Sequence, residues 1–448
     1  MTASIRRLLA LGLVAVLALA AAPLKKIQFT DTKLKNGLRV IISEDHSAPV
    51  FAIAVNYNVG SRDERKGRTG FAHLFEHMMF EGSENVGDGE HMQLVFSNGG
   101  SMNGTTNKER TLYFELLPAN QLDLALFLEA DRMRSLDITK ENLDNQRNAV
   151  QEERRLGIDN QPYGKTFELR DELAYDNFAY EHSVIGSMAD LDAATVDDVA
   201  TFFKIYYAPN NAVLSIVGDV DTKTTLDKVR KYFESIPSQP TPPVPDVTEP
   251  PQKEERRATL DDPLARLPRI DMVYKIPPSS SPDYEPLSVL GTILSSGRSS
   301  RFNENIVRQK QLATSVSAFP GENRGPGLFS IVGMVAPGKA VADVEAAIDA
   351  EVERIKTGPI EDWEIEKART NARSQLVNSL ASSLNRAVTL GQEALFYNDP
   401  DRINTRADRI AKVTAADVQR VAKQYLVKTG RTVITTVPKS APTKGGQS

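Results

Sequence analysis

Hydrophobic and polar positions in the first half of the chain follow two periods. Short runs of β-branched and aromatic residues predict strands, and longer segments with apolar residues every three to four positions predict helices. The expected strands are 38–45, 50–59 and 111–118, and the expected helices are 69–80, 119–134, 141–156, 164–175 and 195–206. Strands come in adjacent runs and so do helices, which favours an α+β fold: a mainly antiparallel sheet with helices packed on one face.

The second half of the chain repeats this organisation. Residues 195–219 align without gaps with residues 414–438, and both segments predict an N-capped helix, a short turn and a strand. Expected strands in this half are 269–277, 315–320 and 329–337, and expected helices are 340–356, 361–376 and 381–397. We therefore expect two tandem related domains, 27–236 and 256–442, followed by a disordered tail at 443–448.

Proline marks the boundary between the two predicted domains. Seven of the 15 residues from 237 to 251 are proline, a density that neither a helix nor a central strand tolerates. The segment 237–255 is therefore predicted to be an extended, semi-rigid linker.

Composition narrows the chemistry. Of the 448 residues, 40% are apolar and 25% charged, and the net charge of -5 shows no basic excess, so we expect a soluble protein that binds no nucleic acid. Cysteine is absent, which excludes disulfides, thiolate metal sites and cysteine nucleophiles. The five histidines are His46, His73, His77, His91 and His182.

The amino terminus has the three-part layout of a secretory signal peptide. Arg6 and Arg7 precede an apolar run from Leu8 to Ala20, and small residues follow. An uncleaved anchor is the alternative, but the run is shorter than the ~20 residues that span a bilayer. We expect a signal peptide at 1–20, export of the mature chain, to the periplasm if the source is a bacterium, and no membrane contact after cleavage.

Residues 70–80, GFAHLFEHMMF, contain the strongest chemical signal. In a helix, His73 and His77 lie on one face, at a spacing that lets two imidazoles bind one metal ion, and Glu76 borders that face. The alternative is a helix with two core histidines and an incidental acid. Composition gives ~0.004 chance matches to H-x-x-E-H, so the metal-site interpretation is favoured.

A zinc site that keeps a water needs a third protein ligand. Because the chain has no cysteine, that ligand is expected to be a carboxylate. The helix predicted at 141–156 offers Glu152 and Glu153, about 100° apart, so only one of them can face the metal. Periodicity does not choose between them, and for either one the alternative is a solvated acid paired with a neighbouring arginine.

H-x-x-E-H followed, about 75 residues later, by an acid-rich helix resembles the inverzincin zinc peptidases of the pitrilysin and mitochondrial-processing-peptidase family. The resemblance begins at residues 36–45, extends through the mature chain and is strongest to bacterial members with two domains per chain. It implies one zinc ion held by His73, His77 and Glu153, with Glu76 as general base. Many members have a further glutamate seven residues before the third ligand, where this chain has Gln146.

The activity that the resemblance implies is zinc-dependent endopeptidase cleavage of peptides or unfolded protein segments. Zinc lowers the pKa of a bound water toward ~7, and Glu76 takes the proton. The first domain would be catalytic and the second inactive, because residues 292–296 (TILSS) stand opposite the histidine motif at the repeat offset. Two alternatives are a non-catalytic structural or processing-partner member of the same fold and a zinc hydrolase of a non-peptide substrate.

The resemblance also suggests how substrate binds. It implies an edge strand at Ser101–Thr106 onto which a peptide adds, with Asn103 near the scissile carbonyl; an ordinary hairpin is the alternative. Family members often place an arginine and a tyrosine against substrate, and here Arg308 is retained whereas Thr314 occupies the tyrosine position. A second subunit that supplies the pair, or a homodimer, is therefore a further hypothesis.

Overall fold

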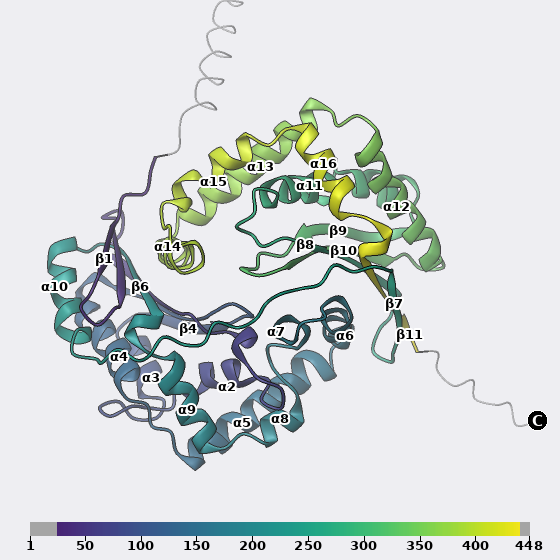
Figure 1. The fold of residues 1–448 in the computed structure, drawn as a ribbon. Helices are drawn as coiled ribbons and strands as arrows, with labels where there is room; N and C mark the ends of the chain where they lie inside the picture. The colour runs from purple at the N-terminus through teal and green to yellow at the C-terminus, as the bar shows by residue number, and fades with distance from the viewer. Residues whose placement is uncertain (1–24, 440–448) are drawn as a thin grey trace, which may run out of the picture.

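Two β-sheets organise residues 25–439, the part of the chain that this computed structural model describes (Figure 1). The signal peptide expected at 1–20 and the tail expected at 443–448 lie outside the described residues. The six-stranded sheet has the order β1-β2-β6-β3-β5-β4, and the five-stranded sheet has the order β7-β11-β8-β10-β9. The strands are β1 (Thr30–Lys33), β2 (Arg39–Glu44), β3 (Val50–Tyr57), β4 (Ser101–Thr106), β5 (Thr111–Pro118), β6 (Ala212–Gly218), β7 (Arg256–Asp262), β8 (Arg269–Ile276), β9 (Ala313–Pro320), β10 (Gly327–Val335) and β11 (Arg431–Pro438).

Helices follow the strands in runs in both halves. Those of the first half are α2 (Phe71–Met78), α3 (Glu90–Ser97), α4 (Leu122–Arg134), α5 (Lys140–Arg154), α6 (Gly164–Ala174), α7 (Phe178–Glu181), α8 (Met188–Asp192), α9 (Val196–Tyr206) and α10 (Thr222–Phe233). Those of the second half are α11 (Tyr284–Ser295), α12 (Val341–Thr357), α13 (Asp362–Leu380), α14 (Ser383–Tyr397), α15 (Arg402–Ala411) and α16 (Ala415–Tyr425). Short 3-10 or π turns include η1 (Ser61–Asp63), η3 (Arg155–Asp159) and η5 (Asn303–Gln309).

The two sheets share one topology, apart from β1, which is an additional edge strand of the first sheet. β2 runs parallel to β6 and β7 runs parallel to β11, while the remaining neighbours in both sheets are antiparallel. The repeat detected in the sequence relates α9 to α16 and β6 to β11, and both helices begin with the same capping box, Thr195 with Asp198 and Thr414 with Asp417. The expected α+β class, with two related halves, is confirmed.

Strand β3 shows how the first sheet is covered on both faces. Its alternate residues Phe51, Ile53 and Val55 pack with the helices of the first half, as predicted. Ala52 and Ala54 face the other way and pack against α14. Figure 1 shows α14 among the helices of the second half, next to the first sheet. Small residues on this face let α14 lie close to the sheet.

The second sheet receives the reciprocal helices. Val273 of β8 and Leu328 of β10 pack with Ala174, Tyr175 and other residues in or next to α6 and α7, which belong to the first half. Each half therefore covers the free face of the other half's sheet. This exchange of helices was not predicted from the sequence, and it makes the two halves one interlocked unit.

Residues 237–255 contain no helix or strand. The segment is nevertheless held at several points. Gln239 exchanges hydrogen bonds with Asn210. Glu249 accepts a hydrogen bond from the backbone N–H of Asp176 and forms an ion pair with Lys275 of β8. The linker is thus fastened to both halves.

Candidate metal centre

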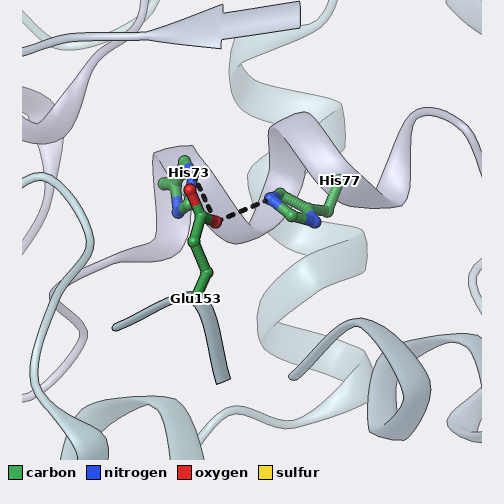
Figure 2. Close-up of side chains that lie close together, drawn as sticks. All are labelled: His73, His77 and Glu153. Carbon is green, nitrogen blue, oxygen red and sulfur yellow. Dashed lines mark ion pairs between the residues drawn. The ribbon is translucent and has the colours of Figure 1, made fainter. Parts of the chain in front are cut away.

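Helices α2 and α5 bring three potential metal ligands together (Figure 2). Nε2 of His73 and Nε2 of His77 each lie 3.4 Å from Oε2 of Glu153. One ligand atom from each of the three residues falls within 4.8 Å of the others. Glu152 instead pairs with Arg155 at 3.1 Å on the exposed side of α5. The packing of the two helices therefore selects Glu153, between the two acids that periodicity left open.

Helix α2 presents this face because its other residues enter the core. Phe71, Leu74, Phe75 and Met78 are at most 5% exposed and belong to the main hydrophobic cluster of the first half. With the apolar side fixed, the i and i+4 positions of the helix direct both imidazoles toward α5.

The N-terminus of α2 is capped by a side chain from outside the helix. The N-cap residue Gly70 has φ of +84° and no side chain to accept a hydrogen bond. The two carboxylate oxygens of Glu64 accept hydrogen bonds from the N–H groups of Gly70 and Ala72 at 2.9 and 2.8 Å. His182 Nε2 lies 3.0 Å from the same carboxylate. No periodic pattern connects Glu64 to the helix, so this capping role could not be predicted from the sequence.

Glu76 is the acid next to the two histidines. Its Oε2 is buried and has no hydrogen-bond partner in the described structure. Strand β4 passes so close that a Cβ built on Gly104 would lie 2.9 Å from Cγ of Glu76. Burial raises the pKa of Glu76, which increases its affinity for a proton. A carboxylate in this setting is suited to accept and return a proton.

The three potential ligands differ in electrostatic setting. Burial, with the neighbouring His77, lowers the pKa of His73 to about 4, so His73 is neutral at pH 7. For His77, burial lowers the pKa, but the hydrogen bond and the charge of Glu153 outweigh it and the net pKa is raised. The hydrogen bond from His77 lowers the pKa of Glu153. The cluster is thus two imidazoles beside an ionised carboxylate.

This donor set fits zinc. Two imidazole nitrogens and one carboxylate oxygen are the three protein ligands of many catalytic zinc sites, which leave a fourth position for water. The buried, unpartnered oxygen of Glu76 supplies a group that could act on that water. In contrast, a structural zinc site would normally have a fourth protein ligand.

A second group of potential ligands, His91, Glu115 and Glu129, lies in the core. His91 Nε2 is 2.7 Å from Glu115, and Arg132 forms an ion pair with Glu129. The guanidinium of Arg132 lies over the ring of Tyr113, 4.4 Å from its centroid. An internal cation already occupies this cluster, which we interpret as structural.

The residues that the resemblance assigns to substrate binding do not form a cluster as the three potential metal ligands do. Asn103 is exposed on β4, next to Gly104, and its side chain accepts a hydrogen bond from the Gly104 N–H at 2.8 Å. Arg308 lies in η5 of the second half, where its guanidinium pairs with Glu304 at 2.6 Å. Thr314 is exposed on β9, with its hydroxyl 3.4 Å from the carbonyl of Met334. Within residues 25–439, no hydrogen bond or ion pair joins Arg308 or Thr314 to the histidine cluster.

The fold and the site together define a class: a tandem α+β chain in which one half carries an inverted H-x-x-E-H helix and a distant carboxylate, the donor set typical of a zinc hydrolase. Sequence profiles agree with this class. Residues 39–187 match a profile described as insulinase (peptidase family M16), and residues 193–372 match one described as the peptidase M16 inactive domain. The chain belongs to peptidase family M16.

Relatives cover nearly its whole length. The protein is 30% identical over 437 residues to the zinc protease PqqE of Helicobacter pylori, an alignment that covers 96% of this chain and 98% of that one. A solved structure of a protease from Helicobacter pylori superimposes with a TM-score of 0.88 at 29% identity, over 92% of this chain and all of that one. A structure titled peptidase M16 inactive domain from Pseudomonas fluorescens, 17% identical, shows the same fold with a TM-score of 0.83, over 93% of this chain and 99% of that one.

Proposed function

We propose that this protein is a zinc-dependent endopeptidase that hydrolyses peptides or unfolded protein segments. The observation that carries the proposal is the convergence of His73, His77 and Glu153, with the partner-free carboxylate oxygen of Glu76 on the same helix. The name of the relative PqqE, a zinc protease, supports the same activity.

In the proposed mechanism, His73, His77 and Glu153 hold one zinc ion. The bound ion supplies Lewis-acid polarisation of the scissile carbonyl and acidifies a water molecule. Glu76 accepts the proton of that water at its buried Oε2 and returns it to the leaving amine. Burial suits Glu76 to both steps because it raises the pKa of the Glu76 carboxyl. The pKa of Glu76 is then closer to the pKa values of the water and the amine with which it exchanges the proton.

Strand β4 is the proposed peptide-binding element. It is an edge strand: among the strands of the described part of the chain it pairs only with β5. Its Gly104 lies directly against Glu76. A peptide added to this edge would be recognised through its backbone, which suits extended or unfolded substrates. Asn103, exposed beside Gly104, is the proposed contact to the scissile carbonyl.

A second subunit is proposed to complete substrate anchoring. The Arg308 side chain is engaged by Glu304 and a threonine stands at position 314, so these two positions do not supply an arginine–tyrosine pair to the histidine cluster. The subunit would be another copy of the chain or a related one. Full peptidase activity from a demonstrated monomer would refute this part of the proposal.

We also propose that the mature protein is exported, to the periplasm if the source is a bacterium, by the signal peptide predicted at 1–20. Between residues 25 and 439, the structure contains no helix that is long and apolar enough to cross a membrane. Amino-terminal sequencing of the mature protein from a cell fraction tests this: we expect a start at Ala21 in the exported fraction, and an intact leader in the cytosol would refute it.

The test of the activity combines zinc content with cleavage of an unstructured peptide, with and without a chelator. We expect one zinc per chain, chelator-sensitive cleavage, and for Glu76→Gln retained zinc with turnover reduced by about 10²–10⁴-fold. Glu152→Gln is the matched control, since it removes an exposed charge next to Glu153. Zinc without peptide cleavage would favour a non-peptide hydrolase, and absence of zinc would favour a structural member of the family.

A further inference from the structure

Two side chains that the proposed mechanism does not use, Gln146 and Glu81, form a series of contacts that begins at His77. Its Nδ1 lies 3.1 Å from Oε1 of Gln146, and Nε2 of Gln146 donates a hydrogen bond to Oε1 of Glu81 at 2.6 Å. Glu81 is 6% exposed and follows α2 by three residues, whereas Gln146 lies two helical turns before Glu153 on the same face of α5. The backbone carbonyl of Glu81 accepts a further hydrogen bond from Asn142 of the same helix.

The chain of hydrogen bonds has a direction, and Glu81 sets it. An ionised carboxylate only accepts, so the amide of Gln146 must turn its NH₂ group toward Glu81 and its carbonyl oxygen toward His77. A carbonyl oxygen only accepts as well, so Nδ1 of His77 must carry the proton. A metal ion that binds here would replace the proton through which Nε2 of His77 hydrogen-bonds to Glu153, so Nε2 would supply the lone pair.

We propose that Gln146 and Glu81 are positioning residues for the metal centre, a relay that fixes His77 in its Nδ1–H tautomer with Nε2 free to bind metal. The inference rests on the proposed zinc site. It explains how the site can have Gln146 where a carboxylate is common. The negative charge is on Glu81, which contacts Gln146, and the hydrogen bond to Glu81 orients the Gln146 amide toward His77. His73 lacks such support, since its Nδ1 is buried without a partner in the described structure.

Exchange of the side chains at positions 81 and 146 tests the relay. In Glu81→Gln, residue 81 can donate as well as accept, so the Gln146 amide can turn and present its NH₂ group to His77. In the double variant Glu81→Gln/Gln146→Glu, a carboxylate at 146 again only accepts from His77. We expect zinc affinity, measured by competition with a chromophoric chelator on the full chain, to fall about 10–100-fold in the single variant and to recover in the double variant.

Glu84→Gln is the matched control, because it removes an exposed charge three residues after Glu81. Zinc affinity of this control should equal that of the wild type. The ¹⁵N chemical shifts of His77 in zinc-loaded, histidine-labelled protein give a second readout, with Nδ1 protonated in the wild type and in the double variant. If Glu81→Gln does not fold, Gln146→Met removes the acceptor of His77 from the other end and is expected to weaken zinc binding similarly.

The failures of the relay and of the proposed function are distinguishable. Equal zinc affinity of Glu81→Gln and Glu84→Gln, a double variant no tighter than the single one, or a protonated Nε2 on His77 would each overturn the relay. A wild type that binds zinc through His73, His77 and Glu153 yet cleaves no peptide would overturn the peptidase proposal. The relay would then still be supported by the predicted pattern of affinities.

Discussion

Replacement of Glu64 by alanine is expected to weaken the helix that carries both histidines. Glu64 is the only side chain observed to accept hydrogen bonds from the first turn of α2 in the described structure, through the N–H groups of Gly70 and Ala72. Its side chain is fully buried, so water cannot replace it without a rearrangement. The carboxylate also interacts favourably with the positive end of the helix dipole.

The structure gives the size of the effect. Each hydrogen bond to a charged acceptor contributes about 1.5–3 kcal/mol, so Glu64→Ala is expected to lower the free energy of unfolding by roughly 3–6 kcal/mol. Glu64→Gln has one carbonyl oxygen for two N–H groups and should lose roughly half as much. A free energy of unfolding of about 5–15 kcal/mol is typical, so the alanine variant would be close to its limit at 37 °C.

Urea unfolding of the metal-free full chain, followed by circular dichroism at pH 7, measures this difference. Zinc titration of the same variants then reports on His73, which follows Ala72 directly. Glu172→Ala, at an exposed position of α6, is the control and should change the free energy of unfolding by less than about 0.5 kcal/mol. A Glu64→Ala protein as stable as this control, or a glutamine variant less stable than the alanine one, would refute the capping argument.

Two further predictions concern the rest of the fold. Burial raises the pKa of Asp63 to about 6, so ionisation of Asp63 lowers the free energy of unfolding as the pH rises from 4 to 7. Over that range the free energy of unfolding of Asp63→Asn, measured with urea, should rise by up to ~3 kcal/mol relative to the wild type. A difference that does not change with pH would contradict this. Leu390 of α14 packs on the first sheet, so Leu390→Ala should lower the free energy of unfolding by about 2–5 kcal/mol. Val377 is half-exposed, so Val377→Ala should change it little. Equal urea midpoints for the two variants would argue against the interlocked halves.

The exchange of α6 and α14 changes the interpretation of the proline-rich segment. Its sequence alone suggested two separate bodies joined by a linker. Because each half lays a helix on the other half's sheet, the linker joins parts that are already packed together. Relative motion of the two halves would therefore have to break the packing of α6 and α14 on these sheets.

The sequence by itself determined the features that depend on a few neighbouring residues. Helical periodicity placed His73, Glu76 and His77 on one face of a helix, and turn, cap and strand patterns located most elements within a few residues. Their tandem repetition was visible in the alignment at 195–219. These features are local, because the geometry of one helical turn or one capping box fixes them.

Only the tertiary structure decided which distant groups meet that helix. It placed Glu153 rather than Glu152 beside the histidines, because the two point about 100° apart and only the packing of α5 on α2 selects one. The cap by Glu64 and the contact of Gln146 with Glu81 likewise join residues that no period connects. Such contacts depend on how buried surfaces of separate elements fit together, which the hydrophobic pattern of one element does not specify.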